Sequence, residues 1–581
     1  MAKIPVMQAA VSVLESEGVD TVFGCPGAAI LPLYKAMEDS SIRHLVVRHE
    51  EGGTHMADGW ARTTGKVGVA ISTSGPGGTN MVTGLYTAMA DSIPIIAITG
   101  QAPTDKLHQE AFQAVDIVEI CKPVTKWAVQ VKEAAQLPWI FREAFRIARS
   151  GRPGPVLIDL PVNVQRNEIE WDASVDAPLP VTVAAPHDAR VERALDMLLA
   201  AKRPLLVAGG GVILGGASAE LREVAELLDV PVHITLMGKG SFPEDHRLYA
   251  GIAGIQTSTP AGNRSFLESD LVLALGARFG DRWTGDLDTF RGDREFIHVD
   301  IEPTQIGKVF PPDLGVVSDT KLFLAALRDA ARRRDDLGDR STWVDRIGDL
   351  QQTLVRRDDY DTVPIKPPRV FREINAFYDP DTYFVTAIGT YQIWSGQFQQ
   401  IHKPRHYQVC GQAGPLGWEI PAAIGVKCAV PDAEVVGVVG DYSFQFLVEE
   451  LAVAAQYDIG FVLVMLNNQY LGLIRQAEMA YDMNYQVDIA YDDHGTDNVK
   501  IMEAYGCSGQ RVTAPGDIRD ALGWARKEVA RTSRPVLVEI MVDREANACM
   551  GPSIDRVTEY EKQHSRDDAV QGAWAEAQAG G

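Results

Sequence analysis

The sequence predicts an α/β fold with three doubly wound parallel-sheet domains, and three observations support this prediction. Short apolar runs alternate with helical segments along most of the 581 residues, which is the pattern of consecutive strand and helix units. Many of these runs, such as residues 435–439, are apolar at every position, as expected for strands that helices cover on both faces. Polar or charged stretches interrupt the alternation twice, so the chain divides into three rounds.

The first round predicts a domain over residues 1–166. Its strands are expected at residues 19–23, 45–47, 67–71, 93–98 and 156–158. The polar stretch 167–186 contains several prolines, and we expect it to be a linker.

The second and third rounds predict domains over residues 187–335 and 365–550. Strands of the second domain are expected at residues 204–208, 271–275 and 296–299, with a helix at 219–228. Strands of the third are expected at residues 383–385, 435–439, 461–466 and 535–538, with a helix at 443–457. The charged segments 332–339 and 356–361 form a second linker zone. Residues 551–581 end in an Ala-, Gln- and Gly-rich stretch and are expected to form a mobile tail.

Composition narrows the class of protein. Apolar residues make up 46% and charged residues 23% of the chain, which is ordinary for a globular protein. The net charge of −23 disfavours nucleic acid or an anionic membrane as a partner, because no basic block offsets it. Six cysteines are scattered without metal-ligand spacing, so we expect them to be reduced. No apolar stretch is long enough for a transmembrane helix, and a cytoplasmic enzyme is the expectation.

Polar side chains follow two neighbouring strands of the third round. Asp441 comes directly after the apolar run 435–439, and Asn467 and Asn468 end the run 461–466, with 25 residues (442–466) between Asp441 and Asn467. The carboxyl ends of parallel strands meet at one edge of a sheet, where ligands bind. Carboxylate, amide and diphosphate oxygens suit Mg²⁺. The alternative is a turn aspartate and a helix-entry asparagine pair without a ligand.

A glycine triplet in the second round is a weaker signal. Gly209, Gly210 and Gly211 follow the strand expected at residues 204–208, and glycines there let a helix N-terminus approach a phosphate. Asp300 and Ile301 follow the strand at residues 296–299, where a carboxylate could meet a ribose. A tight turn explains the triplet about as well.

Four segments near the amino terminus, at residues 23–28, 48–52, 56–62 and 73–80, are similar in order and spacing to the thiamin diphosphate enzyme superfamily and its acetohydroxyacid synthase-like group. The resemblance covers nearly the whole chain. It implies a pyrimidine-binding, a central FAD-binding and a diphosphate-binding domain. It also implies three cofactors, namely thiamin diphosphate, Mg²⁺ and an FAD without a redox role. A homo-oligomer, at least a dimer and by family expectation a tetramer, follows because superfamily sites pair domains of two subunits.

The resemblance also implies the residues that hold these cofactors. For thiamin diphosphate they are Pro26, Gly27, Thr73, Asn80, Gly389, Thr390, Tyr391, Gly414, Leu416, Gly440, Asp441, Tyr442, Ser443, Asn468, Tyr470, Leu471 and Gly472. For FAD they are Gly209, Gly210, Gly211, Thr235, Leu236, Met237, Gly276, Arg278, Asp300, Ile301 and Asp319. The metal ligands implied are the side chains of Asp441 and Asn468 and the backbone carbonyl of Tyr470.

Four residues are expected to act on the reaction itself. Glu50 stands where the superfamily places the carboxylate that binds N1′ of the aminopyrimidine, and an ion-paired surface glutamate is the alternative. Leu416 is the expected prop for the bent cofactor, although leucine before a buried helix is ordinarily part of the core. Arg282 is the candidate for the substrate carboxylate, with a salt bridge to Asp281 or Asp286 as the alternative. Gln113 is expected to line the substrate side.

Longer strings favour one branch of the group. Residues 98–103, 112–117, 410–418, 444–451 and 470–476 resemble the glyoxylate carboligase family, which implies decarboxylation of one glyoxylate and ligation to a second to give tartronate semialdehyde. That family is noted for valine in place of the N1′ glutamate, whereas this sequence has Glu50, so the mode of activation is open. Acetohydroxyacid synthase acting on pyruvate, a flavin-dependent pyruvate oxidase and a non-catalytic cofactor-binding scaffold are the alternatives.

Overall fold

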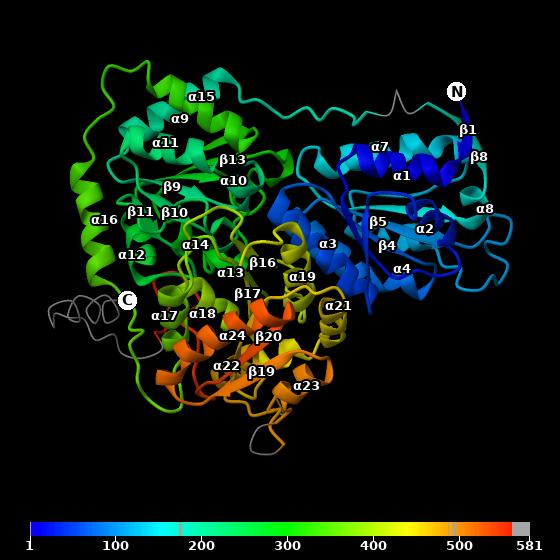
Figure 1. Ribbon diagram of the computed structural model, residues 1–581. Coiled ribbons are helices and arrows are strands. Elements are labelled where there is room, and N and C mark those ends of the chain that lie inside the picture. Colours follow the sequence, from blue (N-terminus) through cyan, green and yellow to red (C-terminus); the bar gives the residue numbers. More distant parts are fainter. Residues whose placement is uncertain (1, 173–176, 486, 492–494, 560–581) are drawn as a thin grey trace.

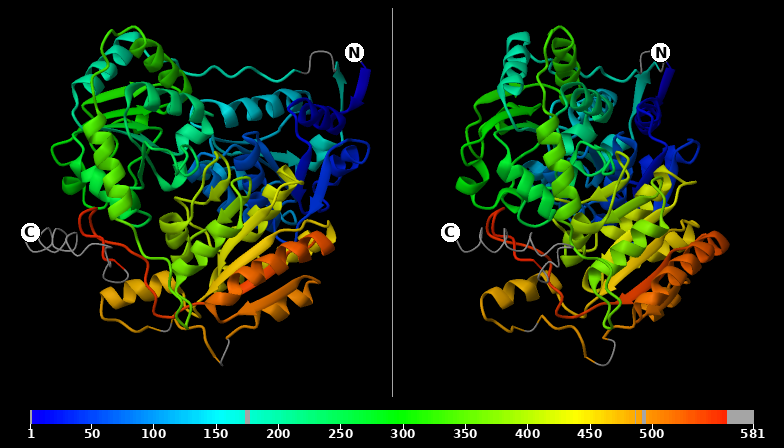
Figure 2. Two further views of the ribbon diagram at one scale, coloured as in Figure 1. Left: turned by 60° about the vertical axis from the view of Figure 1, so that its left-hand side comes forward. Right: turned by 90° about the vertical axis from the view of Figure 1, so that its left-hand side faces the viewer.

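The computed structural model describes residues 2–172, 177–485, 487–491 and 495–559. Three six-stranded parallel sheets dominate this part of the chain (Figure 1), which confirms the predicted fold class. The central strands of each sheet are apolar and almost wholly buried, because helices cover both faces of the sheet. Figure 2 shows the three domains grouped so that each lies beside the other two.

The first sheet has the order β3-β2-β4-β5-β7-β6. Its strands are β3 (Arg43–Val46), β2 (Thr21–Gly24), β4 (Gly68–Ser72), β5 (Ile95–Gln101), β7 (Val156–Pro161) and β6 (Trp127–Gln130). Its main helices are α1 (Val6–Ser16), α2 (Leu31–Met37), α3 (Glu50–Thr64), α4 (Pro76–Asn80), α5 (Val82–Asp91) and α7 (Leu137–Arg149). A short antiparallel pair joins β1 (Ala2–Pro5) to β8 (Glu168–Trp171), so this domain's structure extends past residue 166.

The second sheet has the order β11-β10-β9-β12-β13-β14. Its strands are β11 (Tyr249–Gly251), β10 (Val232–Ile234), β9 (Pro204–Ala208), β12 (Leu271–Leu275), β13 (Glu295–Asp300) and β14 (Leu314–Val317). Its helices include α9 (Asp188–Ala200), α10 (Gly210–Leu214), α11 (Ser218–Leu228), α12 (Pro260–Glu268), α13 (Asp281–Thr284), α14 (Leu287–Arg291), α15 (Thr320–Ala331) and α16 (Ser341–Thr353). Residues 177–187 run along one side of the molecule to the start of α9 (Figure 1).

The third sheet has the order β16-β15-β17-β18-β20-β19. Its strands are β16 (Tyr407–Val409), β15 (Tyr383–Thr386), β17 (Val435–Gly440), β18 (Val462–Asn467), β20 (Val536–Met541) and β19 (Ser508–Val512). Its helices include α17 (Pro367–Phe377), α18 (Thr390–Phe398), α19 (Glu419–Ala429), α20 (Asp441–Phe444), α21 (Leu451–Gln456), α22 (Gly472–Ala480), α23 (Asn498–Ala504) and α24 (Ile518–Thr532).

The strand order of each sheet creates a topological switch point. In the third sheet the chain passes from β15 outward to β16 and then returns to β17 on the other side of β15. The loops after β15 and β17 therefore diverge and leave a crevice at the carboxyl ends of these strands, which is where open α/β sheets bind ligands. The same reversal occurs between β2 and β4 in the first sheet and between β9 and β12 in the second.

The first and third domains share one hydrophobic core, which contains residues of both α3 and α19. These two helices pack in close contact because glycines face the partner backbone. A Cβ on Gly59 would lie 2.4 Å from the Ala422 carbonyl oxygen, and a Cβ on Gly425 would lie 2.0 Å from that of Met56. Larger residues at these two positions would force the helices apart.

Two features differ from the sequence expectations. The helix expected at residues 443–457 is broken into α20, a 3₁₀ turn (Val448–Glu450) and α21, because Leu447 adopts a left-handed conformation with φ of 53°. Sequence patterns also missed edge strands such as β6, β14 and β19, which are short and only partly buried, so they lack the continuous apolar pattern of the central strands.

The carboxyl-terminal segment crosses back to the central domain. Gly551 donates a backbone hydrogen bond to Ile255, and Asp286 donates one to Pro552. An ion pair joins Glu559 to Arg356. Residues 551–559 of the expected mobile tail are therefore packed on the protein, and residues 560–581 lie outside the described part of the chain.

Candidate active site

Asp441 lies at the switch point of the third sheet. It is the first residue of α20, directly after β17, and its side chain is buried. Burial raises the pKa of this carboxyl to about 7, and the groups that oppose the shift are backbone N–H groups, including those of Asn468 and Gln469, rather than a basic side chain. A buried carboxylate without a cationic partner is costly, and a bound divalent cation would remove that cost.

The two asparagines at the end of β18 face different ways. The Asn467 amide donates to Glu539 at 2.8 Å, within the sheet. The Asn468 amide turns toward the loop after β15, because a Cβ on Gly472 would lie 2.7 Å from Asn468 Nδ2 and 2.9 Å from Thr390 Oγ1. Gly472 therefore keeps open a polar cradle, and Asn468 is the asparagine placed to serve it. The prediction that Asn468 and the Tyr470 carbonyl bind metal stays a prediction.

Two helix N-termini converge on this cradle. α18 begins at Thr390 and α22 begins at Gly472, and each helix has nine residues. Free backbone N–H groups and the helix dipole make such ends favourable for phosphate oxygens. The loops after β15, β17 and β18 thus combine one buried carboxylate, one amide and two helix ends, a donor set that fits a diphosphate with its cation.

Leu416 lies in the loop before α19. It is half-buried and belongs to none of the hydrophobic clusters of the described residues, so the core alternative for this leucine is not supported. The same loop touches the central domain, because a Cβ on Gly280 would lie 3.5 Å from Gln412 Oε1.

Arg282 follows Gly280 closely, in α13. Its side chain is 78% exposed and forms only a loose ion pair with Asp281, at 3.9 Å. The weak surface pair with Asp281 that was the alternative is therefore present, and it leaves most of the guanidinium exposed. The prediction that Arg282 binds the substrate carboxylate stays a prediction.

Glu50 is the first residue of α3 in the first domain. Asn80 Nδ2 donates to its Oε2 at 2.9 Å, while Oε1 lies on the side of Gly77. Glu50 is thus held by a neutral amide and not by a cation, which argues against the ion-paired surface alternative.

The other residues predicted in the first domain gather around the same switch point. A Cβ on Gly27 would lie 2.5 Å from Thr73, so the loops after β2 and β4 touch. A Cβ on Gly75 would lie 2.8 Å from Gln113 Cβ. Gln113 therefore packs against the loop that follows Thr73. The structure therefore brings together the residues that the sequence grouped in this domain.

Glu450 was missed by sequence reasoning although it lies within the string 444–451. Its buried carboxylate accepts backbone N–H bonds from Arg48 (3.1 Å) and His49 (2.7 Å), directly before Glu50. A Cβ on Gly52 would lie 2.5 Å from Glu450 Oε1. Glu450 belongs to the third domain, so it ties that domain to the start of α3 and fixes the backbone that carries Glu50. Its burial could not be read from the sequence pattern.

The predicted FAD segments converge at the switch point of the second sheet. Gly209 and Gly211 pack against Gly276, since a Cβ on either would lie within 2.7 Å of that backbone, and a Cβ on Gly210 would lie 3.2 Å from Met237 Cβ. Two of the three glycines are thus explained by close backbone packing. Thr235 caps the turn that contains Leu236 and Met237.

The polar residues of the FAD set have protein partners. Arg278 donates to the Ala90 carbonyl and lies 3.7 Å from Asp91, both in the first domain. Asp300 accepts from the Glu302 amide and is followed by the half-buried Ile301. Asp319 caps α15. A place for FAD here stays a prediction.

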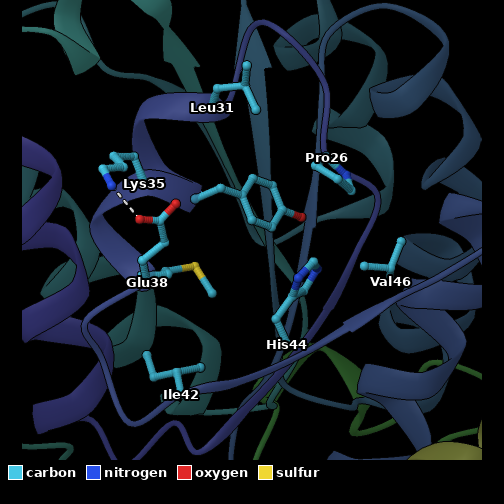
Figure 3. A pocket seen from close by; sticks show the side chains of 9 residues that line it. Pro26, Leu31, Lys35, Glu38, Ile42, His44 and Val46 are labelled. Carbon is cyan, nitrogen blue, oxygen red and sulfur yellow. Dashed lines mark hydrogen bonds and ion pairs between the residues drawn. The ribbon is translucent and has the colours of Figure 1, made fainter. Parts of the chain in front are cut away.

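A cavity on the outer face of the first domain is distinct from these sites. It lies between α2 and β3 and is lined by Pro26, Leu31, Tyr34, Lys35, Met37, Glu38, Ile42, His44 and Val46 (Figure 3). Pro26 is its only lining residue among those predicted for the cofactor. Its wall is mostly apolar, so it does not suit a diphosphate.

Within the described residues, no three His, Cys, Asp or Glu side chains are grouped as a metal centre. The six cysteines are free thiols. No described helix has the length and apolar character needed to cross a membrane.

Fold and site together define a class. Three parallel α/β domains, a diphosphate cradle with a buried carboxylate at the third sheet, and a helix-borne glutamate at the first describe a protein that binds a diphosphate cofactor between domains. Family models agree with this description. They match the N-terminal TPP binding domain of thiamine pyrophosphate enzymes at residues 4–120, the central domain at residues 191–327 and the C-terminal TPP binding domain at residues 387–540.

Curated relatives span the whole chain. The chain is 49% identical over 574 residues to a glyoxylate carboligase of Escherichia coli O157:H7, with 97% of each chain covered. It is 40% identical over 564 residues to a probable acetolactate synthase large subunit of Methanocaldococcus jannaschii, covering 95% of this chain and 94% of the relative. It is 38% identical over 549 residues to an acetolactate synthase large subunit of Corynebacterium glutamicum, covering 93% and 87%. The chain belongs to the thiamine pyrophosphate enzyme family, and its cofactor is thiamin diphosphate.

The geometry of Glu450 predicts a pH effect on stability. Burial raises the pKa of Glu450 from 4.5 to about 8, against the two backbone hydrogen bonds and nearby Arg48. The folded state therefore holds a proton that the unfolded state releases between about pH 4.5 and 8, so this group's contribution to stability falls as the pH rises through that window. One such proton corresponds to a slope of about 1.4 kcal/mol per pH unit.

Glu450→Gln removes this proton and should flatten the pH dependence of the free energy of unfolding by up to that slope. Denaturant unfolding of the apoprotein between pH 5 and 8 measures the effect, with Glu503→Gln, an exposed glutamate of the same domain, as the control. Equal pH slopes for wild type and Glu450→Gln would contradict this assignment.

Proposed function

We propose that this protein is a thiamin diphosphate-dependent carboligase that decarboxylates one glyoxylate and joins the remaining carbon unit to a second glyoxylate, giving tartronate semialdehyde and CO₂. The observation that carries the proposal is the combination of the Asp441 cradle and the Glu50–Asn80 pair in a chain that is 49% identical to a glyoxylate carboligase. We further propose Mg²⁺ at Asp441 and Asn468, a non-redox FAD at the second sheet, and a dimer or tetramer. The expected cytoplasmic location stays a prediction.

Thiamin diphosphate supplies an electron sink that accepts the electrons released when the substrate loses CO₂. The protein supplies position and proton transfer. Glu50 Oε2 is occupied by the Asn80 amide, which leaves Oε1 to bind or release a proton at the aminopyrimidine nitrogen. The Asn80 hydrogen bond also holds the Glu50 side chain in one orientation.

Substrate binding needs positive charge, because the substrate is an anion and the chain carries a net charge of −23. Arg282 is exposed and weakly paired, and its segment touches the loop that carries Leu416. A planar guanidinium can bind a carboxylate through two parallel hydrogen bonds. Leu416, only half-buried without substrate, would present an apolar surface that excludes water from the reacting carbon.

Acetolactate synthesis from pyruvate is the second candidate, since relatives with that description are 38% and 40% identical. The direct test supplies the purified protein with thiamin diphosphate, Mg²⁺ and FAD, and measures CO₂ and products from glyoxylate and from pyruvate. We expect kcat/KM for glyoxylate to exceed that for pyruvate by at least about tenfold, because one added methyl group in a small pocket changes binding by about 1–3 kcal/mol.

Acetolactate as the main product would contradict the glyoxylate proposal and favour the second candidate. Bleaching of the flavin on addition of substrate would instead favour an oxidase. Absence of CO₂ release from both acids would favour a non-catalytic role.

Replacing Glu50 tests the proton-transfer assignment. Glu50→Val removes the carboxylate while keeping an apolar side chain of moderate size at the start of α3. We expect exchange of the C2 proton of the bound cofactor with deuterated water to slow by about 100-fold or more, the usual contribution of a positioned acid or base. Rapid-quench NMR measures this first step separately from overall turnover, and Glu51→Gln is the control. An unchanged exchange rate in Glu50→Val would show that another group moves the proton.

A further inference from the structure

A second carboxyl group is buried in the third domain, near the cradle but not in it. Glu419 is the first residue of α19 and is 0% exposed. The Tyr391 hydroxyl donates to its Oε1, and the Ser443 hydroxyl lies 3.0 Å from both carboxylate oxygens. Both partners are neutral hydroxyls. Burial raises the pKa of Glu419 to about 7, and these two hydrogen bonds oppose the shift.

The partners of Glu419 come from three different loops of the site. Tyr391 follows Thr390 at the start of α18, in the loop after β15. Ser443 comes two residues after Asp441, in the loop after β17. The Ser443 hydroxyl also accepts the backbone N–H of Gly417, at 2.9 Å, and Gly417 directly follows Leu416. One carboxyl group is therefore bonded, directly or through one hydroxyl, to the loops after β15 and β17 and to the loop that carries Leu416.

The ring of Tyr391 transmits this connection to the backbone. A Cβ on Gly440 would lie 2.8 Å from two carbon atoms of the ring, and a Cβ on Gly389 would lie 2.3 Å from it. One edge of the ring thus packs against both Gly389 and Gly440, the residues that precede Thr390 and Asp441. Because interiors are close-packed, a ring that shifts must move both loops. Fixing the Tyr391 hydroxyl therefore fixes the spacing of the switch point.

The hydroxyl groups of Tyr391 and Ser443 require a hydrogen-bond acceptor at position 419. Tyr391 and Ser443 each have one hydroxyl proton, and the second role of Ser443 is to accept from Gly417. Without a carboxyl oxygen, both protons would be buried and unpartnered, which costs about 1–3 kcal/mol for each group. Glu539, another buried glutamate of this domain, bonds instead to Asn467 and Asn498 and pairs with Arg511. Of these two buried glutamates, only Glu419 connects the cofactor loops to one another.

We propose that Glu419 is a positioning residue that holds the diphosphate-binding, metal-binding and Leu416 loops in one arrangement before thiamin diphosphate binds. This rests on the cofactor assignment and not on the choice of glyoxylate as substrate. The consequence is that Glu419 acts on cofactor affinity and on the chemical step through Tyr391 and Ser443, without touching the cofactor itself.

The test measures the dissociation constant of thiamin diphosphate at fixed Mg²⁺, by titrating the tryptophan fluorescence of the cofactor-free full-length protein. We expect Glu419→Ala to weaken binding by about 10- to 100-fold, as is usual for residues that orient ligand-binding groups. Glu419→Gln keeps an oxygen acceptor for Tyr391 and should retain most of the affinity. The affinity of Tyr391→Phe for thiamin diphosphate should lie between those of Glu419→Ala and Glu419→Gln.

Tyr378→Phe is the matched control for Tyr391→Phe. Tyr378 is a buried tyrosine of the same domain whose hydroxyl has no partner in the structure. Tyr378 packs in a hydrophobic cluster of the third domain, so loss of its hydroxyl should leave cofactor affinity unchanged. Thermal unfolding of each cofactor-free variant separates a general loss of stability from a loss of loop positioning.

At saturating cofactor, the positioning role predicts a fall in kcat and a weaker near-ultraviolet circular dichroism signal of the bound cofactor, with KM for the substrate unchanged. A variant that combines Glu419→Ala and Tyr391→Phe should bind thiamin diphosphate no more weakly than Glu419→Ala alone, because both changes break the same hydrogen bond. Equal cofactor affinity in wild type, Glu419→Ala and Tyr391→Phe would overturn the proposal. If Glu419→Ala does not fold, equal affinities of Tyr391→Phe and Tyr378→Phe would overturn it.

Failure of the wild type to bind thiamin diphosphate would instead contradict the cofactor assignment on which the proposed function rests. Activity on pyruvate in place of glyoxylate would change the substrate and leave the role of Glu419 intact.

Discussion

The burial of the Asp441 carboxylate at the carboxyl end of β17 is the constraint on which the rest of the site depends. A carboxylate removed from water and faced only by backbone N–H groups is unfavourable unless a cation binds it. The surrounding loops bring further polar groups to the same place. Asn468 turns into the cradle, and the N-termini of α18 and α22 add N–H groups for phosphate oxygens. The parallel sheet order places all of these groups at one edge.

A second set of contacts makes the position of Glu50 depend on the third domain. The start of α3 is held by Glu450, and the middle of α3 packs on α19 through glycines that leave no space for side chains. α19 begins at Glu419, which is bonded to the cofactor loops. The helix that carries Glu50 and the loops around Asp441 are therefore joined through two buried carboxyl groups of one domain. Both have a raised pKa for the same reason, namely burial, which outweighs the hydrogen bonds that each accepts.

The sequence predicted those parts of the molecule that depend on local pattern. Central strands such as β17 and β18 are apolar throughout, so their positions and the polar residues at their ends could be read directly. The grouping of Gly27 with Thr73, and of Glu50 with Asn80, followed from motif order. The edge strands β6, β14 and β19 were missed because partial burial leaves no continuous apolar run. The break at Leu447 was missed because a left-handed leucine has no sequence signature.

Residues whose role depends on tertiary context could not be predicted. Glu419 and Glu450 look like ordinary helix-start glutamates, and only the fold shows that each is buried against loops distant in sequence. Arg278, which the resemblance assigns to the flavin, also donates to the Ala90 carbonyl of the first domain, a contact that the sequence does not show. Two glycines of the triplet are needed for packing against Gly276, so the triplet alone was weak evidence for a phosphate.

The most direct test of the central claim is the affinity for thiamin diphosphate with Mg²⁺ and with the metal removed by chelation, in wild type, Asp441→Ala and Asp432→Ala. Asp432 is exposed and precedes the other end of β17, so it is a matched control. We predict that Mg²⁺ tightens binding by more than about tenfold, or about 1.4 kcal/mol, in wild type and Asp432→Ala, and that Asp441→Ala loses this gain. Metal-independent binding in wild type, or an unchanged metal effect in Asp441→Ala, would contradict the account.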